Sequence, residues 1–133
     1  MTGLDTNVLV RYLTQDDASQ ARKANALVAD TVARGERCFV VGVVLCELVW
    51  VLRGAYAFDK ATVVGVLERI LATAQFTIDE KDVVRRAVDD YRSGKGDFAD
   101  YLIGHHGQES GCRTTATFDR QLKGSALFQV LAP

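Results

Sequence analysis

The stretch CFVVGVVLCELVWVL, residues 38–52, is the longest apolar run in the chain and decides its class of fold. The run is shorter than the ~20 apolar residues of a membrane-spanning helix and contains Glu47, so we expect no membrane span. Its beginning, together with Arg37, favours a buried strand over residues 37–41, and its remainder predicts a buried helix over Val43–Arg53. A strand followed at once by a helix is typical of an α/β domain.

The sequence on either side of this run continues the alternation. Before it, the pattern predicts a strand through Leu4 and helices over Thr6–Leu13 and about Asp17–Ala33. After it, the pattern predicts strands at 75–78, 112–118 and 128–131, and helices over 61–73 (capped by Asp59), 79–92 and 98–108. We therefore expect a three-layer α/β/α sandwich with a mostly parallel central sheet.

Length and composition indicate one ordinary globular domain over residues 1–133, with 48% hydrophobic residues. The formal charge is −1, from 16 basic and 17 acidic residues, so any nucleic-acid contact must come from a local patch. Cys38, Cys46 and Cys112 fit neither a disulfide framework nor a zinc motif, which favours a reducing compartment. With no room for a signal peptide before Leu4, we expect a cytoplasmic protein.

Glu47 is the most informative single residue, because it is the only ionisable group between Arg37 and Arg53. An isolated carboxylate in so apolar a helix costs several kcal/mol unless it is protonated, paired or bound to a cation. The alternative is that Glu47 faces solvent or pairs with an arginine.

Four further acids stand at element boundaries. Asp5 and Asp119 each close a predicted strand, where parallel sheets gather their ligands, although Asp119 could simply form an Asx turn. Asp97 and Asp100 lie three residues apart at a helix start. Helix capping alone would explain Asp97, whereas Asp100 lies inside the first turn, where a purely structural sequence would tolerate many residues.

Converging carboxylates repel one another, so a shared site at neutral pH needs either raised pKa values or a divalent cation. Ligands that are all oxygen select hard ions such as Mg²⁺ or Mn²⁺. Such ions usually keep water ligands, and a metal-activated water beside a phosphodiester is a nucleophile for hydrolysis.

Four motifs in order along the chain resemble the PIN-domain ribonuclease family, in particular the VapC-type toxins of bacterial toxin–antitoxin modules. These motifs are LDTNVLVRYLTQDD (4–17), CELVWVL (46–52), DFADYLIG (97–104) and TATFDRQL (115–122). The resemblance implies an endoribonuclease that hydrolyses RNA, with a cognate antitoxin protein as partner. We also expect a homodimer.

The resemblance further implies an acidic pocket that holds one or two Mg²⁺ or Mn²⁺ ions. Its carboxylates would come from Asp5, Glu47, Asp100 and Asp119. Asp97 precedes the family's usual third acid, so it is carried over only as an extra metal ligand or a helix cap. Asn7 and Thr117 resemble the polar residues that orient the carboxylates and water of such a pocket.

Other interpretations are open. His105 and His106 suggest a metal-free acid–base nuclease, but adjacent helical residues point about 100° apart. A receiver domain of two-component signalling also uses acids at strand ends, yet no acidic pair follows the first strand here. A catalytically silent PIN-like binding module is the remaining alternative, and the filling of all four acid positions counts against it.

Substrate contacts are only weakly indicated by the sequence. Arg92 and Lys95, beside the glycines of RSGKGD, could contact RNA phosphates near the acidic pocket. A solvated helix end, whose cations suit the helix dipole, explains them equally well.

Overall fold

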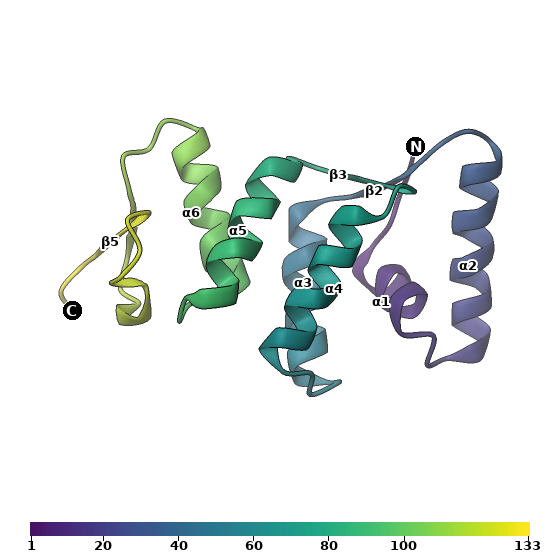
Figure 1. Ribbon diagram of the computed structural model, residues 1–133, viewed down its shortest axis with the longest axis horizontal. Helices are drawn as coiled ribbons and strands as arrows, with labels where there is room; N and C mark the ends of the chain where they lie inside the picture. The colour runs from purple at the N-terminus through teal and green to yellow at the C-terminus, as the bar shows by residue number, and fades with distance from the viewer.

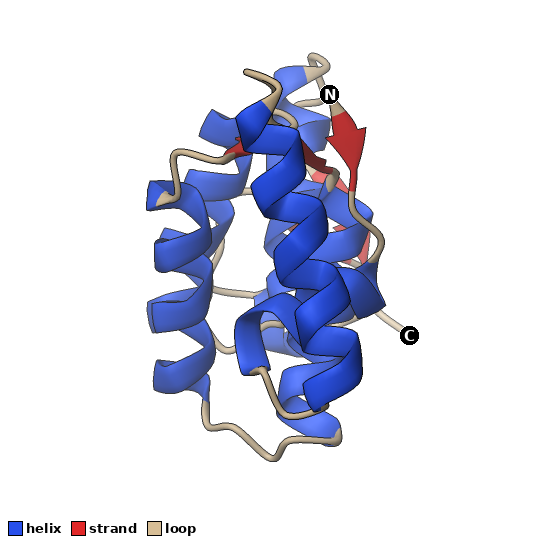
Figure 2. Ribbon diagram, turned by 90° about the vertical axis from the view of Figure 1, so that its right-hand side faces the viewer, coloured by secondary structure: helices blue, strands red, loops and turns tan.

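The computed structural model describes all 133 residues and confirms the predicted alternation of strands and helices. Its elements are β1 (Thr2–Gly3), α1 (Thr6–Thr14), α2 (Ala18–Ala33), β2 (Cys38–Val40), α3 (Gly42–Gly54), α4 (Lys60–Ala72), β3 (Phe76–Ile78), α5 (Lys81–Ser93), α6 (Phe98–Glu109), β4 (Thr115–Thr117), the 3₁₀ helix η1 (Arg120–Leu122) and β5 (Phe128–Val130). Helices make up most of the molecule (Figure 2). None of them has the length and apolar character to cross a membrane.

Helix starts follow local capping signals. The Asp17 carboxylate accepts a hydrogen bond from the Gln20 N–H (3.0 Å) at the start of α2. The Asp59 carboxylate does the same for the Thr62 N–H (2.8 Å) at the start of α4. Because a capping side chain satisfies a backbone donor that the helix itself leaves free, such residues fix the first turn.

The first three strands form a parallel sheet in the order β1-β2-β3, with Thr2 opposite Cys38 and Cys38 opposite Phe76. The apolar run of residues 38–52 supplies its central strand and then α3, as predicted. Leu45 and Leu48 of α3 have no exposed surface and belong to one core of 28 buried residues. This core holds α3 and α4 against the sheet.

The α/β class with parallel strands is confirmed, but the five strands form two sheets instead of one central sheet. β4 and β5 pair in parallel with each other, and Figure 1 shows α5 and α6 between α3 and α4 and the end of the molecule that carries β5. These two strands pack on α6. A Cβ at Gly104 would be 2.9 Å from the Phe128 ring, and one at Gly107 would be 2.8 Å from the Thr115 hydroxyl. The two glycines therefore let β4 and β5 pack directly on α6.

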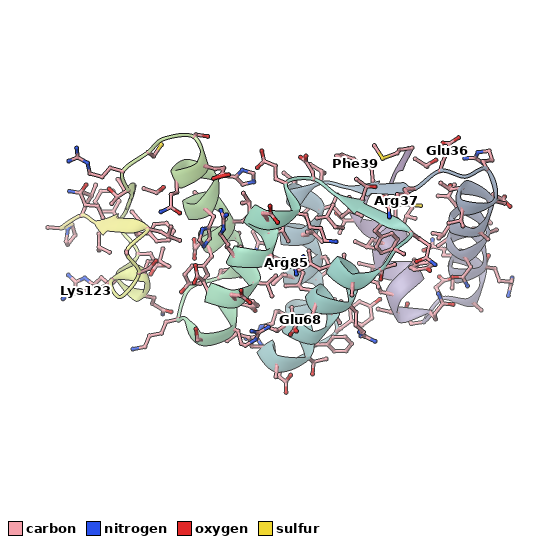
Figure 3. The ribbon with its side chains drawn as sticks, turned by 45° about the horizontal axis from the view of Figure 1, so that its top comes forward. Glu36, Arg37, Phe39, Glu68, Arg85 and Lys123 are labelled. Carbon is pink, nitrogen blue, oxygen red and sulfur yellow. The ribbon has the colours of Figure 1, made fainter.

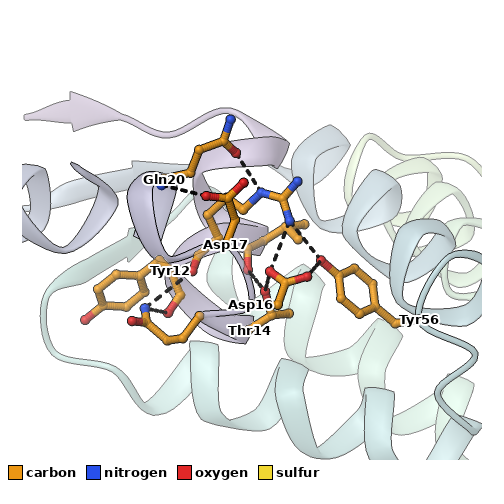
Figure 4. A network of polar contacts seen from close by, with 9 residues as sticks. Tyr12, Thr14, Asp16, Asp17, Gln20 and Tyr56 are labelled. Atoms are coloured by element: carbon orange, nitrogen blue, oxygen red, sulfur yellow. Dashed lines mark hydrogen bonds and ion pairs between the residues drawn. The ribbon is translucent and has the colours of Figure 1, made fainter. Parts of the chain in front are cut away.

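A polar network joins the end of α1 to the loop after α3 (Figure 4). Asp16 accepts hydrogen bonds from the Tyr56 hydroxyl (2.7 Å), the Thr14 hydroxyl (2.7 Å) and the Arg11 guanidinium (3.0 Å). The bond from Tyr56, followed by the bond from Thr14, lowers the pKa of Asp16 to about 2. The network thus holds α1, which begins just after Asp5, against the end of α3.

Candidate active site

Three of the predicted acids line one polar pocket of about 360 Å³, which we call the acid pocket. Side chains from α3, α4, α5, α6 and the segment around η1 meet there. Its lining residues are Arg53, Lys60, Tyr91, Lys95, Gly96, Asp97, Asp100, Asp119 and Gln121. Three carboxylates therefore face three cationic side chains within one small volume.

The capping of α6 positions two of these acids. The Asp100 carboxylate accepts the Asp97 N–H through Oδ2 (3.0 Å), and Asp97 Oδ1 accepts the Phe98 N–H (2.8 Å), which makes a capping box. The second oxygen of Asp97 accepts a hydrogen bond from the Trp50 indole N–H (2.7 Å). Asp97 is thus a helix cap, as the sequence suggested, and also the attachment point of α3 on α6.

The third acid is held by its own turn. Asp119 Oδ1 accepts the Gln121 N–H (2.9 Å) at the start of η1. The Asp119 N–H donates to the Thr117 hydroxyl (3.0 Å). Thr117 therefore fixes the backbone that carries Asp119.

The acid pocket disfavours the charge on Asp100. Partial burial raises the pKa of Asp100, and the negative charges of Asp97 and Asp119 raise it further, against the lowering effect of the hydrogen bond from the Asp97 backbone. A cation bound beside Asp100 would therefore offset the repulsion on its charge.

Asp5 and Glu47 form a second acidic group outside the acid pocket. Asp5 caps α1 and accepts the Val8 N–H through Oδ1 (3.1 Å). The Thr6 hydroxyl donates to Glu47 Oε1 (2.7 Å). Asp5 and Glu47 are both exposed. Glu47 lies on the outward face of α3, whereas Leu45 and Leu48 lie on its buried face. The apolar helix around Glu47 therefore creates no burial penalty for its charge.

The outward face of α3 connects the two acidic groups. Glu47 lies one turn before Trp50, whose indole reaches Asp97 of the acid pocket. The Cys46 thiol is affected by the charges of both acidic groups. Burial raises its pKa to about 11, and the negative charges of Asp97 and Glu47 raise it further. No three histidine, cysteine, aspartate or glutamate side chains converge tightly enough to hold a metal ion together.

These acids keep carboxylate oxygens that are free to bind a cation, as the structural cap Asp17 also does. In each of the four acids that the resemblance selected, one oxygen accepts a hydrogen bond within the chain and the other has no donor. In Asp97 both oxygens are bonded. An all-oxygen donor set of half-free carboxylates, one of them with a raised pKa, fits the chemistry of a hard divalent cation such as Mg²⁺ or Mn²⁺.

Comparison with known proteins now identifies the fold family. A family model described as the PIN domain matches residues 4–126. The chain belongs to the PIN-domain family. It is also similar to a protein named VapC ribonuclease from Aquifex aeolicus (strain VF5), with 28% identity over 120 residues that cover 90% of this chain and 88% of that protein. The match to the PIN-domain model runs from Leu4 to Ala126, so it includes the five acids predicted for the site.

Two of the other predicted site residues lie away from the acid pocket in this PIN domain. Asn7 lines a different, small pocket between α1 and α2. Arg92 pairs with Glu68 of α4 (2.9 Å) and with Asp89 (3.4 Å), and all three side chains are exposed. Lys95, in contrast, does line the acid pocket. Of the two cations predicted to contact RNA phosphates, Arg92 and Lys95, only Lys95 therefore lies at the acid pocket.

The two histidines do not face a common site. His105 is buried, and its Nε2 lies 2.6 Å from Asp90. His106 Nδ1 lies 2.6 Å from Glu80 at the start of α5. Neither ring lines the acid pocket, which disfavours a paired-histidine mechanism in this PIN domain.

Sequence reasoning missed three residues around the acid pocket. The Lys60 ammonium donates to the Tyr91 carbonyl (3.0 Å) and the Gly94 carbonyl (2.7 Å), and thereby fixes the end of α5. Arg53 donates to the Phe58 carbonyl (3.3 Å). No local signal marks either cation. Trp50 carried a signal, because a tryptophan three residues after Glu47 shares its helix face and cannot be fully buried if Glu47 is exposed.

Proposed function

We propose that this PIN domain is a metal-dependent endoribonuclease that acts as the toxin of a toxin–antitoxin pair. Family membership and the similarity to the VapC ribonuclease support a ribonuclease. The observation that carries the proposal is the acid pocket, where Asp97, Asp100 and Asp119 meet and where burial and the neighbouring charges raise the pKa of Asp100. Converging carboxylates of this kind are expected of ligands for a cation, because a bound cation offsets their mutual repulsion.

Asp100 and Asp119 of the acid pocket would hold the Mg²⁺ or Mn²⁺ ion, together with Asp5 and Glu47 of the second acidic group. Such an ion lowers the pKa of coordinated water and so supplies a nucleophile near neutral pH. The chain orients these groups: the capping box fixes Asp100, and Thr117 fixes the turn of Asp119. Lys95 contacts a phosphate of the RNA without reading its base.

The proposed partners follow from the same chemistry. An antitoxin that inserts an arginine beside Asp100 would offset the repulsion there without a metal ion. We expect the protein to be a cytoplasmic homodimer that co-purifies with the product of an adjacent small reading frame. Free expression without that partner, and with no effect on growth, would count against the toxin role. It would favour the catalytically silent binding module.

Three matched substitutions test the ligand set. Asp100→Asn and Asp119→Asn should abolish RNA cleavage in the presence of Mg²⁺ or Mn²⁺, since each removes a charged ligand at nearly constant volume. Asp17→Asn, at the cap of α2 and outside the acid pocket, should remain active, because asparagine caps a helix as well as aspartate does. Circular dichroism checks that all three variants fold. Cleavage by Asp100→Asn at the wild-type rate would exclude the proposed ligand set.

Metal binding has a readout that is independent of activity. Trp50 is the only tryptophan of the chain, and its indole N–H is bonded to Asp97 at the edge of the acid pocket. Titration with Mn²⁺ should therefore change the tryptophan emission of the wild-type protein in a saturable manner. The same titration of Asp100→Asn should leave the emission unchanged.

Product chemistry separates this proposal from the histidine mechanism. Hydrolysis by an external water leaves a 5′-phosphate and a 3′-hydroxyl, whereas a base that activates the 2′-hydroxyl leaves a 2′,3′-cyclic phosphate. Mass spectrometry of the fragments distinguishes the two. Cyclic phosphate ends that disappear in His106→Ala would refute the four-carboxylate mechanism.

A further inference from the structure

A second and larger pocket adjoins the acid pocket. It has a volume of about 690 Å³ and lies between the end of α5, α6, η1 and the loop before β5. We call it the basic pocket, because its lining includes the cationic side chains of Lys95, Arg120 and Lys123. Figure 3 labels Lys123 at the C-terminal end of the molecule, far from Glu36 and Arg37.

The three cations of the basic pocket have no ion-pair partner, unlike Arg92, which is committed to Glu68. The only acid in the lining is Asp90, and its carboxylate is engaged by His105 Nε2 at 2.6 Å. The pocket therefore carries a net positive charge in a chain whose total charge is −1. Such a local patch attracts phosphate groups.

The SGKG turn forms the wall between the two pockets. Lys95 and Gln121 line both of them. The turn packs closely on its neighbours, because a Cβ at Gly94 would collide with the Tyr101 hydroxyl and one at Gly96 with the Leu122 side chain. An RNA strand that leaves the acid pocket past Lys95 therefore has the basic pocket directly beside it.

The polar lining indicates which part of an RNA is bound there. The hydroxyls of Ser93 and Ser125 and the amide of Gln121 can donate hydrogen bonds to phosphate oxygens. The only aromatic ring in the lining, Tyr101, is 4% exposed, so no ring face is available for a base to stack on. The pocket suits the sugar–phosphate backbone, not the bases.

We propose that the basic pocket binds backbone phosphates of the RNA strand that flanks the scissile linkage. The proposal rests on the proposed ribonuclease function and extends it to Arg120 and Lys123, two residues with no part in the acid pocket. Such contacts position the strand for cleavage and are independent of sequence. They would bind only substrates long enough to pass the SGKG turn.

The test compares the double variant Arg120→Ala/Lys123→Ala with the wild-type protein. Arg22→Ala/Lys23→Ala is the matched control, because it removes two exposed cations from α2 at the opposite end of the molecule. For a long single-stranded RNA, we expect the double variant to raise KM about 10-fold or more with little change in kcat. The slope of log affinity against log salt should fall by roughly 1.4, about 0.7 for each lost phosphate contact.

A short RNA that spans only the scissile linkage should be cleaved equally by the wild-type protein and the double variant. If the double variant lost cleavage activity equally on short and long RNA, the proposal would be overturned. An unchanged slope of log affinity against log salt would overturn it as well. Competition by inorganic phosphate or a mononucleotide tests for a free anion as the ligand. If either binds the wild-type protein while RNA affinity is the same in the double variant, the pocket is a free-anion site and the RNA proposal fails.

Binding of fluorescently labelled RNA without divalent cation, followed by anisotropy, keeps this test separate from catalysis. If no variant cleaves RNA but the double variant still loses affinity and salt dependence, the proposed enzymatic function fails while the phosphate site stands. If cleavage occurs and anisotropy is unaffected, the phosphate site fails alone.

Discussion

Tyr101→Phe removes a single oxygen atom from the wall between the acid pocket and the basic pocket. The Tyr101 side chain is 4% exposed, and its hydroxyl oxygen accepts the N–H of Gly96 at 3.1 Å. Gly96 is buried, so the substitution leaves a backbone donor without a partner and without water. An unsatisfied buried donor costs about 1–3 kcal/mol, and we expect the free energy of unfolding to fall by that amount.

Urea unfolding followed by circular dichroism measures the change in the free energy of unfolding. The m-value should stay constant, because the exposed surface in the unfolded state is unchanged. The ring itself should keep its edge-to-face contact with Phe128, whose centroid lies 6.5 Å away. Hydrogen exchange at the Gly96 amide should accelerate more than the global loss of stability requires, since the SGKG turn loses its anchor.

Tyr12→Phe provides the matched control. The Tyr12 ring also packs edge-to-face, against Phe76 at 5.8 Å, but its hydroxyl makes no hydrogen bond within the chain. Its loss should change the free energy of unfolding by no more than about 0.5 kcal/mol. If Tyr101→Phe costs no more than Tyr12→Phe, the hydroxyl does not hold the turn and the reasoning is refuted.

Three further predictions concern packing, pH and thiol chemistry. Alanine at Gly65, where a Cβ meets nothing within 4 Å, should raise the melting temperature, whereas alanine at Gly104 should lower it because α6 is crowded there. Tyr56→Phe should destabilise the protein at neutral pH. The difference should vanish as pH falls through about 2, because the lowered pKa of Asp16 stabilises the fold only while that carboxylate is charged. A thiol reagent should modify Cys112 first, because the other two cysteines are buried or half-buried; simultaneous reaction of all three would contradict the structure.

Local signals predicted the elements well. The carboxylates of Asp17, Asp59 and Asp97 stand where helices begin, and each accepts a backbone N–H there. Such signals act within three or four residues, so they can be read without knowledge of the fold. The pairing of strands cannot be read in this way. The pairing of β4 with β5 outside the first sheet depends on contacts between distant parts of the chain, such as the packing of Phe128 on Gly104 of α6.

The candidate site shows the same division. Capping by Asp97 and the closeness of Asp100 followed from their spacing in the sequence. The outward position of Glu47 did not, because an apolar helix has two faces and the sequence does not say which one the core covers. The position of Lys60 at the acid pocket could not be predicted either, since its carbonyl partners lie more than 30 residues further along the chain.

The order of the strands in the three-stranded sheet is also their order in the chain, β1-β2-β3. That sheet is therefore complete once the ribosome has synthesised residue 78. The acid pocket needs Gln121, and the basic pocket needs Leu127, both of which follow this sheet in the chain. During translation the scaffold of β1, β2 and β3 therefore precedes both pockets, and neither pocket can form before the segment around η1 has been synthesised.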